Sequence, residues 1–453
     1  MKKFRVMCHM GCLLVLFAGP GCFFACERVQ YPPEEDLSSV SSCVGCHTNY
    51  AYLQKVYSPD TTAVVSGCGG DAPHYEPYDR VFMGGTGYDA YKASSHYYVG
   101  CKGCHNGNDH TPDKTKAHSG DFISHPSSHA EEKCGACHEQ IVATFATALH
   151  NGTGQKRKVT MRSGLAGPEE FDQLPAHQIE GYTNKCSTCH GTCGNCHIVR
   201  PPIAGGGLAK GHAFTKTPDM VTVCVSCHES RGGHAYLGVA SGTVPDVHLK
   251  EMGYKCLDCH DGSEMHGDGT TPQQRYAYAE LPKCEDCHDG IATANSYHTQ
   301  HFSDFNCQVC HSQDYNNCGS CHVNAEGARV PSYLSFKIAV NPLPDIKSGY
   351  RLALVRRTLA APDNWSAYGV EDYSNFDAFP TYNYTTPHNI LRWTSRTTVE
   401  EGQSCSASCH LRVEGDTVLN RHLYLMKGDL LDWEHAATDA ITMDDQLPGD
   451  WML

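Results

Sequence analysis

Ten copies of the pattern Cys-x-x-Cys-His run through the chain, and in each a histidine directly follows two cysteines that are separated by two residues. Two thiols at this spacing reach one edge of a porphyrin on a single backbone turn and form thioethers with its vinyl positions. The adjacent histidine then points its imidazole at the iron as the proximal ligand. The pattern predicts covalent c-type haem at these residues: Cys43, Cys46 and His47; Cys101, Cys104 and His105; Cys134, Cys137 and His138; Cys186, Cys189 and His190; Cys193, Cys196 and His197; Cys224, Cys227 and His228; Cys256, Cys259 and His260; Cys284, Cys287 and His288; Cys307, Cys310 and His311; Cys318, Cys321 and His322.

An eleventh site departs from the pattern, because three residues instead of two separate Cys405 from Cys409, which His410 follows. A bulged turn can absorb one extra residue while the second cysteine and the histidine stay adjacent. We therefore expect eleven haems, ten at complete motifs and one at this variant site. A degenerate site or a disulfide is the alternative at this position.

Other uses of the 27 cysteines fit the pattern less well. Zinc sites pair two Cys-x-x-Cys units per metal without a histidine after each unit, and iron–sulfur clusters typically take four cysteines. A disulfide scaffold has no use for the histidines. The motifs account for 22 cysteines, and Cys8, Cys12, Cys22 and Cys26 lie near the N-terminus. Cys68 remains, as an inert buried thiol, an intermolecular link or a haem ligand.

The second axial ligand of each haem is expected to be histidine. Of 29 histidines, eleven follow motif cysteines and His9 lies near the N-terminus, which leaves 17 for at most eleven distal positions. Methionine is the competing ligand and would raise the reduction potential, whereas bis-histidine ligation predicts low potentials. The expected distal ligands are His96, His110, His118, His129, His150, His177, His212, His234, His248, His266, His298, His301, His388 and His422, with His74, His125 and His435 as weaker candidates.

The first 25 residues have the pattern of an export signal, with a positively charged start and a short apolar run. Cys22 or Cys26 could instead be the lipidated first residue of a lipoprotein, so a membrane link is expected only through such a lipid. Cleavage at residue 25 removes three positive charges and no acids, and changes the net charge from -15 to about -18. This acidity argues against nucleic acid as a partner. It favours a redox partner protein with a basic docking face, or serves only solubility.

Four segments are expected along the chain: the export signal at 1–25, an N-terminal segment with one haem at 26–90, a nine-haem core at 91–330, and a C-terminal region with the variant site at 331–453. The core has roughly 27 residues per haem, too few to build an apolar core from side chains. Haems packed against one another must take that place. The tethers between His190 and Cys193 and between His311 and Cys318 are short enough to bring neighbouring porphyrins close together.

The predicted fold class is therefore irregular and haem-packed, with mostly short helices and loops and a small β-containing C-terminal region. Helical spacing of apolar residues predicts a helix over 139–149. Alternating apolar residues predict strands over 335–340 and 351–356. The stretch 370–393, rich in Tyr, Phe and Asn, belongs to the same region, and a short helix is expected over 423–433.

These motifs resemble the large multihaem c-type cytochromes of bacteria that respire metals, minerals, or sulfur and nitrogen compounds. The resemblance covers residues 43–322 and 405–410, and the three-residue gap of the variant site departs from it. It implies export, and a role in electron transfer during anaerobic respiration in the periplasm, at the outer membrane or at the cell surface. An electron conduit is the function expected first. A terminal reductase with one open haem, acting on nitrite, hydroxylamine, tetrathionate or sulfite, is one alternative, and a subunit of a polymeric haem wire is another. An extracellular metal or mineral is a possible electron acceptor.

Overall fold

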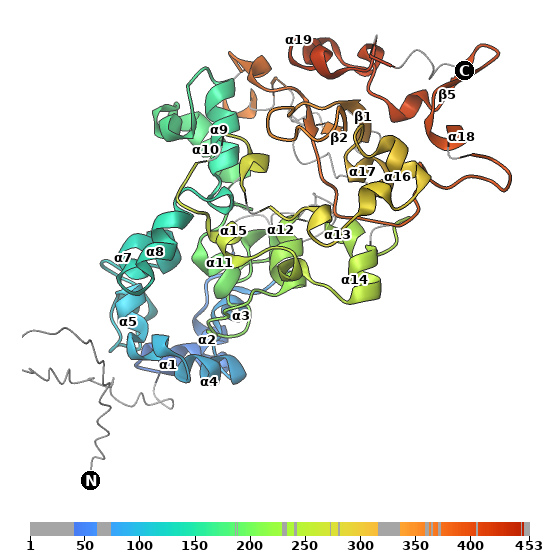
Figure 1. The fold of residues 1–453 in the computed structure, drawn as a ribbon. Helices are drawn as coiled ribbons and strands as arrows, with labels where there is room; N and C mark the ends of the chain where they lie inside the picture. Colours follow the sequence, from blue (N-terminus) through green and yellow to red (C-terminus); the bar gives the residue numbers. More distant parts are fainter. Residues whose placement is uncertain are drawn as a thin grey trace, which may run out of the picture.

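Short helices joined by long loops make up most of the molecule, and a small antiparallel sheet lies in its C-terminal part (Figure 1). The computed structural model describes residues 40–60, 74–185, 187, 189–228, 233–239, 242–271, 273–279, 281–315, 336–357, 362–363, 366–369, 373–404, 406–444 and 446–447. The expected export signal with Cys22 and Cys26 lies outside these residues, as does Cys68. The predicted class of short helices and loops with a C-terminal β region is confirmed.

Helices of the N-terminal half are at most 11 residues long among the described residues. Glycine, proline and turn residues interrupt the apolar pattern between the motifs, so no long amphipathic helix can form. The predicted helix over 139–149 is present in part: it begins earlier, turns sharply at His138, and ends at Phe145. The helices are α1 Cys43–His47, α2 Tyr50–Val56, α3 Pro77–Val81, α4 Thr86–Lys92, α5 Gly100–His105, α6 Lys114–Ala117, α7 Ala130–Lys133, α8 Gly135–Phe145, α9 Thr153–Arg162 and α10 Ala176–Lys185.

Helices of the second half are shorter still, and several consist of little more than a motif. They are α11 Cys193–His197, α12 Ser226–His228, α13 Gly233–Tyr236, α14 Val247–Met252, α15 Gly262–His266, α16 Ser296–His301, α17 Cys307–His311, α18 Ser406–Cys409 and α19 His435–Thr438.

The sheet has the order β1-β2-β3, with β1 at Phe336–Val340, β2 at Leu352–Arg357 and β3 at Tyr382–Tyr384, all antiparallel. The predicted strands lie within one residue of β1 and β2. Because β2 is paired on both edges and covered on both faces, nearly all of its residues are buried. Strands β4 (Arg412–Glu414) and β5 (Thr417–Leu419) form a separate hairpin.

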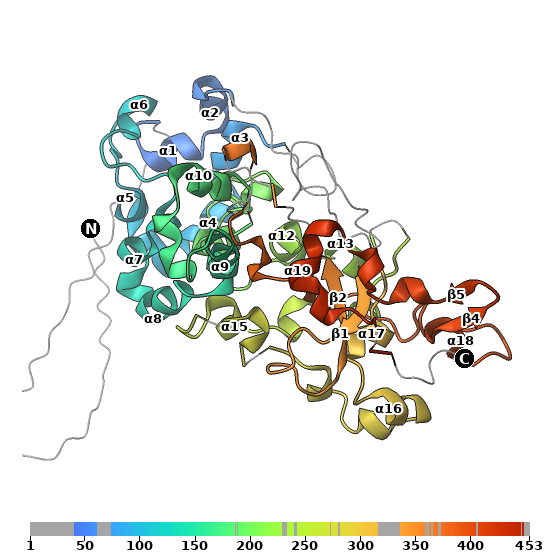
Figure 2. The same cartoon turned by 90° about the horizontal axis from the view of Figure 1, so that it is seen from above.

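The apolar side-chain core of the protein lies mainly around this sheet. Of the twelve largest fully buried side chains among the described residues, only Val44 precedes residue 300. Ile338 and Leu354 pack with Tyr424 and Met443 on one face of the sheet. The N-terminal helices α1 to α5 lie at the opposite end of the molecule from α18 and the β4–β5 hairpin in both views (Figure 2).

The prediction of a helix over 423–433 is wrong. Leu425 donates its backbone N–H to Ile338 O and accepts from Met443 N, which holds the chain extended beside β1. Gly428 then lies within a 3-10 turn, Lys427–Asp429, and a second turn spans Asp432–Glu434. Pairing with the sheet has overridden the local helical pattern.

Candidate functional site

The motif sites are numbered 1 to 11 in chain order, with the variant site as site 11. Most described motifs form one helical turn, such as α1 at site 1, α11 at site 5 and α17 at site 9. Ser42 caps α1 by accepting a hydrogen bond from Gly45 N at 2.9 Å. One such turn places both cysteines of a site on the same side of the backbone, directly before the histidine. The spacing of the motif therefore has the local geometry that two-point attachment requires.

One continuous cavity of about 4140 Å³ runs through the molecule. All 18 motif cysteines that the structure describes line it, and so do all ten described motif histidines. Pockets for single small ligands measure about 300–1,000 Å³. The cavity therefore has room for several large groups, and every described motif faces it.

Nine motif histidines each face a second histidine from another part of the chain. The ring centroids of the nine pairs are separated by 5.7 to 6.3 Å. In six pairs the rings lie at 65° to 82° to one another, and in three at 21° to 27°. The steep pairs are His47–His118, His105–His212, His228–His150, His288–His248, His311–His298 and His410–His301, and the near-parallel pairs are His138–His96, His197–His266 and His260–His388.

These separations match two imidazoles bound to opposite sides of one metal ion. With metal–nitrogen bonds of about 2 Å on each side, as for zinc, the ring centroids of such ligands lie roughly 6 Å apart. In one pair the Nε2 atoms of His260 and His388 face each other directly at 3.4 Å. The pairs therefore form nine positions where one metal could take two imidazole ligands.

Backbone carbonyls hold many of these rings in place through Nδ1. His47 Nδ1 donates to Val81 O at 3.0 Å, and His105 Nδ1 donates to Ile123 O at 2.8 Å. A carbonyl can only accept, so the proton of the neutral ring lies on Nδ1 and the lone pair lies on Nε2. The same contact to a carbonyl is made by His118, His197, His301, His311 and His388. Such partners orient metal-binding imidazoles.

Two histidines of the pairs have a carboxylate at Nδ1 instead. His260 Nδ1 donates to Glu264 Oε2 at 2.6 Å, and this contact raises the pKa of His260. His248 Nδ1 donates to Asp246 Oδ1 at 3.0 Å. A carboxylate in this position increases the basicity of the ring and strengthens its bond to a metal.

Burial keeps several of the paired rings neutral. It lowers the pKa of His212 to about 4, and it also lowers the pKa of His47, His150 and His388. A neutral imidazole is the form that binds a metal ion.

The nine partner histidines were all among the fourteen expected distal ligands. The other five lie elsewhere. His110, His129, His177 and His422 are exposed and do not line the cavity, and the side chain of His110 is 85% exposed beside Asp109. His234 lies on α13, also away from the cavity lining. Of the weaker candidates, His125 lines the cavity, whereas His74 contacts Glu76 and His435 contacts Asp439 at the surface.

Three sites are described in part or not at all. Cys186 of site 4 and Cys405 of site 11 lie outside the described residues, as do Cys318, Cys321 and His322 of site 10. Cys189 and His190 of site 4 line the cavity with the other motifs.

The variant turn of site 11 is held by two side chains from the following segment. Asn420 Nδ2 donates to Ala407 O at 2.9 Å and to His410 O at 2.8 Å, and so ties the two ends of the turn together. The buried Tyr424 donates its hydroxyl to Cys409 O at 2.8 Å. Sequence reasoning did not single out either residue, because both act through tertiary contacts.

Two buried arginines line the cavity on helix α9. Arg157 and Arg162 are 7% and 5% exposed, and the Nε–H of each has no hydrogen-bond partner among the described residues. Burial is the main reason that the pKa of Arg162 falls to about 10. A buried guanidinium with an unused N–H is suited to bind a carboxylate.

No family model matches this chain, and no curated protein or solved structure matches it. In the described part of the chain, every helix is too short or too polar to cross a membrane.

Proposed function

We propose that the protein is a multihaem c-type cytochrome that conducts electrons. The observation that carries this proposal is the set of nine histidine pairs, each of which joins a motif histidine to a distant histidine at the spacing of two axial ligands. Zinc sites, iron–sulfur clusters and disulfides give no reason for a second imidazole opposite each motif.

The surroundings of the pairs fit haem. Haem is a large apolar ring with two carboxylates, and the cavity offers both room and a cation for such a group. Its volume of about 4140 Å³ lies between segments that have few buried apolar side chains of their own. Arg157 and Arg162 offer unused N–H groups to carboxylates inside it. A haem-packed core would thus supply the apolar burial that these short helices need.

The cysteines and histidines of each site have separate roles. Haem, when bound, supplies an iron that takes up and releases one electron. The two cysteines of a site would attach the group covalently, and the two histidines would hold its iron. Two histidines at each of nine sites would leave a substrate no coordination position there, which favours electron transfer over substrate chemistry.

An exported protein of net charge near -18 suits a role between a donor and an acceptor outside the cytoplasm. Haem attachment by this motif and the expected signal at residues 1–25 support a location in the periplasm or at the outer surface, with a lipid at Cys22 or Cys26 as the anchor in the lipoprotein alternative. A redox protein with a basic docking face is the partner that its charge favours.

Expression in a bacterium that attaches c-type haem, followed by rapid-mixing spectroscopy, tests this function. We expect intact-mass measurement to find up to eleven haems, and a low-potential donor followed by a ferric acceptor to reduce and reoxidise all of them reversibly. Cys287→Ala should remove one haem, whereas His435→Ala, which changes a surface histidine, should remove none. A polypeptide without haem, or haems that stay oxidised with a strong donor, would refute the proposal.

A further inference from the structure

Contacts between neighbouring sites give the order of the sites in space. Sites 1 and 2 share one apolar cluster, in which Val44 of the first motif packs with Tyr91 beside Cys101 of the second. Phe214 then joins sites 2 and 3, because its ring stacks on His96 at 3.8 Å and lies 5.4 Å from His212. These two histidines are the partners at sites 3 and 2, so the first three sites form a contiguous row.

Site 3 lies next to site 5 in space, although site 4 is the next motif in the sequence. Ser127 Oγ lies 2.7 Å from Thr192 Oγ1, directly before the Cys193 motif, and a Cβ at Gly194 would meet Ser127. The turn Pro126–His129, which holds Ser127, contacts both helix α7, directly before Cys134 of site 3, and helix α11 of site 5.

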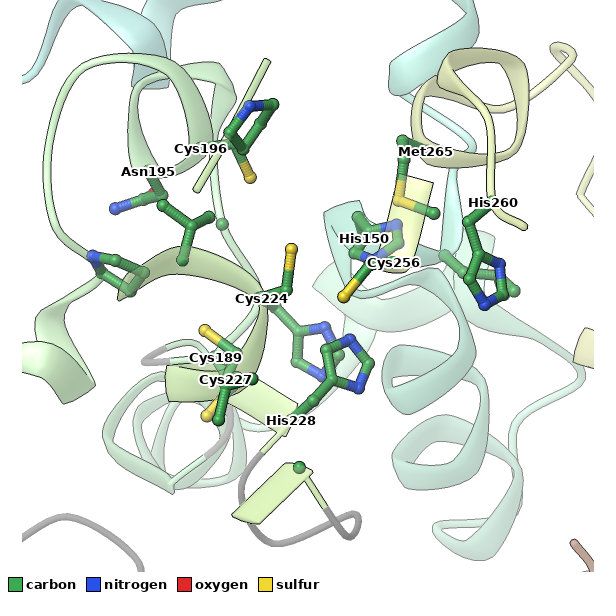
Figure 3. Close-up of a pocket in the computed structure, with 18 of the residues that line it drawn as sticks. His150, Cys189, Asn195, Cys196, Cys224, Cys227, His228, Cys256, His260 and Met265 are labelled. Atoms are coloured by element: carbon green, nitrogen blue, oxygen red, sulfur yellow. The ribbon is translucent and has the colours of Figure 1, made fainter. Parts of the chain in front are cut away.

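Site 6 touches two other sites through its cysteines. The side chain of Cys227 lies beside that of Cys189 of site 4, and the side chain of Cys224 lies beside that of Cys256 of site 7 (Figure 3). Helix α11 of site 5 contacts the helical turn Met220–Val225, which carries Cys224 of site 6. The attachment edges of sites 4, 5 and 7 therefore all meet the edge of site 6.

Sites 7 and 8 are joined through Asp246. Its Oδ1 accepts from His248 Nδ1 at site 8, and its Oδ2 accepts from Ile390 N at 2.6 Å, two residues after His388 of site 7. One buried carboxylate thus positions the partner histidines of both sites.

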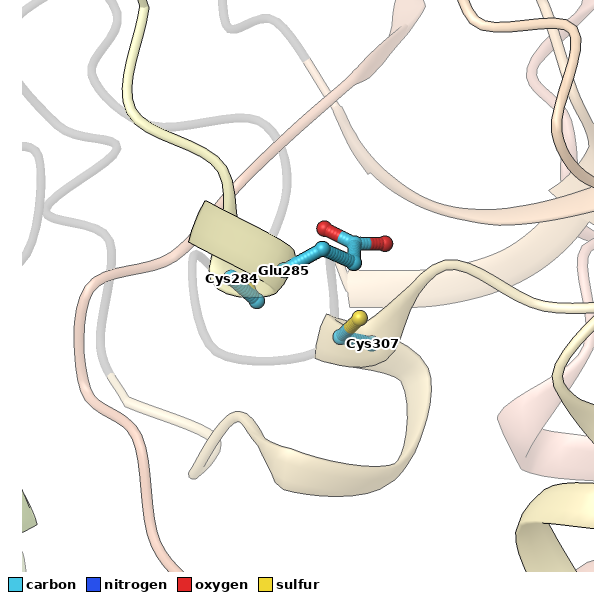
Figure 4. Close-up of side chains that lie close together, drawn as sticks. All are labelled: Cys284, Glu285 and Cys307. Atoms are coloured by element: carbon cyan, nitrogen blue, oxygen red, sulfur yellow. The ribbon is translucent and has the colours of Figure 1, made fainter. Parts of the chain in front are cut away.

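Sites 8, 9 and 11 continue the row. The sulfurs of Cys284 and Cys307 lie within 4.8 Å of each other beside Glu285 (Figure 4). This cluster has the composition of a metal site, but each of its cysteines belongs to a different motif and is committed to attachment. Helix α16 then supplies His298 to site 9 and His301 to site 11, three residues apart.

We propose that these sites form one relay in the order 1, 2, 3, 5, 6, 7, 8, 9, 11, with site 6 as the junction that links the N-terminal row to the C-terminal row and to site 4. The inference rests on the proposed function. At each step one electron leaves ferrous iron at one site and reduces ferric iron at the next, and no bond or proton changes. Electron transfer slows steeply with the separation of the groups, so loss of site 6 divides the relay.

Voltammetry of an oriented protein film tests the junction. A cysteine introduced by Lys55→Cys on the exposed side of α2, in a Cys68→Ser background, attaches the end with site 1 to gold. The electrode is the electron donor. Intact mass gives the haem count of every variant beforehand, so failure of haem attachment, which would refute the proposed function, is seen separately from failure of the relay order.

In the parent protein, the charge of all haems should pass in one fast phase. With Cys224→Ala and Cys227→Ala, only the charge of sites 1, 2, 3 and 5 on the electrode side should remain fast, which is four of the ten sites that remain. The matched control, Cys405→Ala with Cys409→Ala, removes the site at the far end and should keep a single fast phase that is one haem smaller. A single fast phase in the site 6 variant would overturn the proposal, because sites 5 and 7 would then exchange electrons directly.

His150→Met tests the same junction without removing a haem, in case the double cysteine variant does not fold. Methionine in place of the site 6 partner histidine raises the potential of that site. Electrons then stay at site 6, and reoxidation of sites 7, 8, 9 and 11 through the electrode should slow at least tenfold. His301→Met makes the same change at site 11 and should leave the other sites fast. Unchanged kinetics in His150→Met, with its potential shifted, would overturn the proposal.

Discussion

The Nε2 atoms of His260 and His388 lie 3.4 Å apart, although 128 residues separate them in the chain. Each ring is held at its Nδ1 atom: the Glu264 carboxylate accepts a hydrogen bond from His260, and the backbone carbonyl of Thr386 accepts one from His388. The C-terminal region thereby supplies a partner histidine to a motif in the middle of the chain. Metal binding at this pair would fasten the two regions together.

Removal of His388 should open one coordination position. We expect His388→Ala to convert one low-spin haem at site 7 to high-spin, because no second imidazole then faces His260. Electron paramagnetic resonance of the oxidised protein measures this change. His435→Ala is the control, since that ring contacts Asp439 at the surface and faces no motif histidine. An unchanged spectrum in His388→Ala would mean that His388 is not an axial ligand.

Neutralising Glu264 should raise the potential of the same site. The carboxylate at His260 Nδ1 places negative charge behind the ligand and stabilises ferric iron over ferrous iron. Glu264→Gln keeps the hydrogen bond and removes the charge, so one haem should reduce at a higher potential in an optical redox titration. Asp268→Asn removes a nearby exposed charge that caps Thr270, and should have little effect. A fall in potential in Glu264→Gln would contradict this account.

Asn420 should decide whether the variant motif holds a haem. Asn420→Gly keeps the positive φ of 62° accessible but removes both hydrogen bonds that close the turn. Loss of the two bonds is worth about 1–3 kcal/mol, enough to lower occupancy at site 11. Intact mass should then show a fraction of chains with one haem fewer. Thr417→Ala, in the adjacent hairpin, should show none, and full occupancy in Asn420→Gly would exclude this role.

The buried ion pair between Arg357 and Glu434 should stabilise the C-terminal region. Glu434 is 1% exposed, and its carboxylate accepts hydrogen bonds from Arg357 Nη2 at 2.7 Å and from Arg357 Nε at 3.0 Å. Glu434→Gln leaves the guanidinium charge buried without its counter-ion, at a cost of about 3–5 kcal/mol. Hydrogen exchange of the β2 amides measures the local free energy of opening.

The exposed pair Arg412–Glu414 is the matched control for this variant. Glu414→Gln should change exchange by less than about 1 kcal/mol, because exposed ion pairs contribute little. Equal effects of the two variants would show that burial of the Arg357 pair is not what matters.

The sequence predicts those structural elements that depend on residues close together in the chain. The strands at Phe336–Val340 and Leu352–Arg357 follow from alternating apolar residues, and each motif turn follows from its own spacing. The helix expected over 423–433 is wrong because Leu425 pairs with Ile338 of β1, a contact between distant segments.

The partner histidines also show that contacts between distant segments are not predictable from the sequence. A surplus of histidine predicts that partners exist, and all nine that the structure pairs with motif histidines were in the expected set. Composition cannot distinguish His118, which faces His47, from His110, whose side chain is exposed, eight residues earlier. The pairing itself depends on how loops fold around the cavity, as for His105 and His212, which are 107 positions apart.

Near-infrared magnetic circular dichroism of the oxidised protein, read together with its electron paramagnetic resonance, tests the central claim most directly by counting bis-histidine haems per chain. We predict at least nine. Three should give the rhombic signal of near-parallel imidazoles, and six should give the large-g signal of steeply crossed ones, as the ring angles of 21° to 27° and 65° to 82° require. A count well below nine, or a majority of high-spin or methionine-bound haem, would contradict the account.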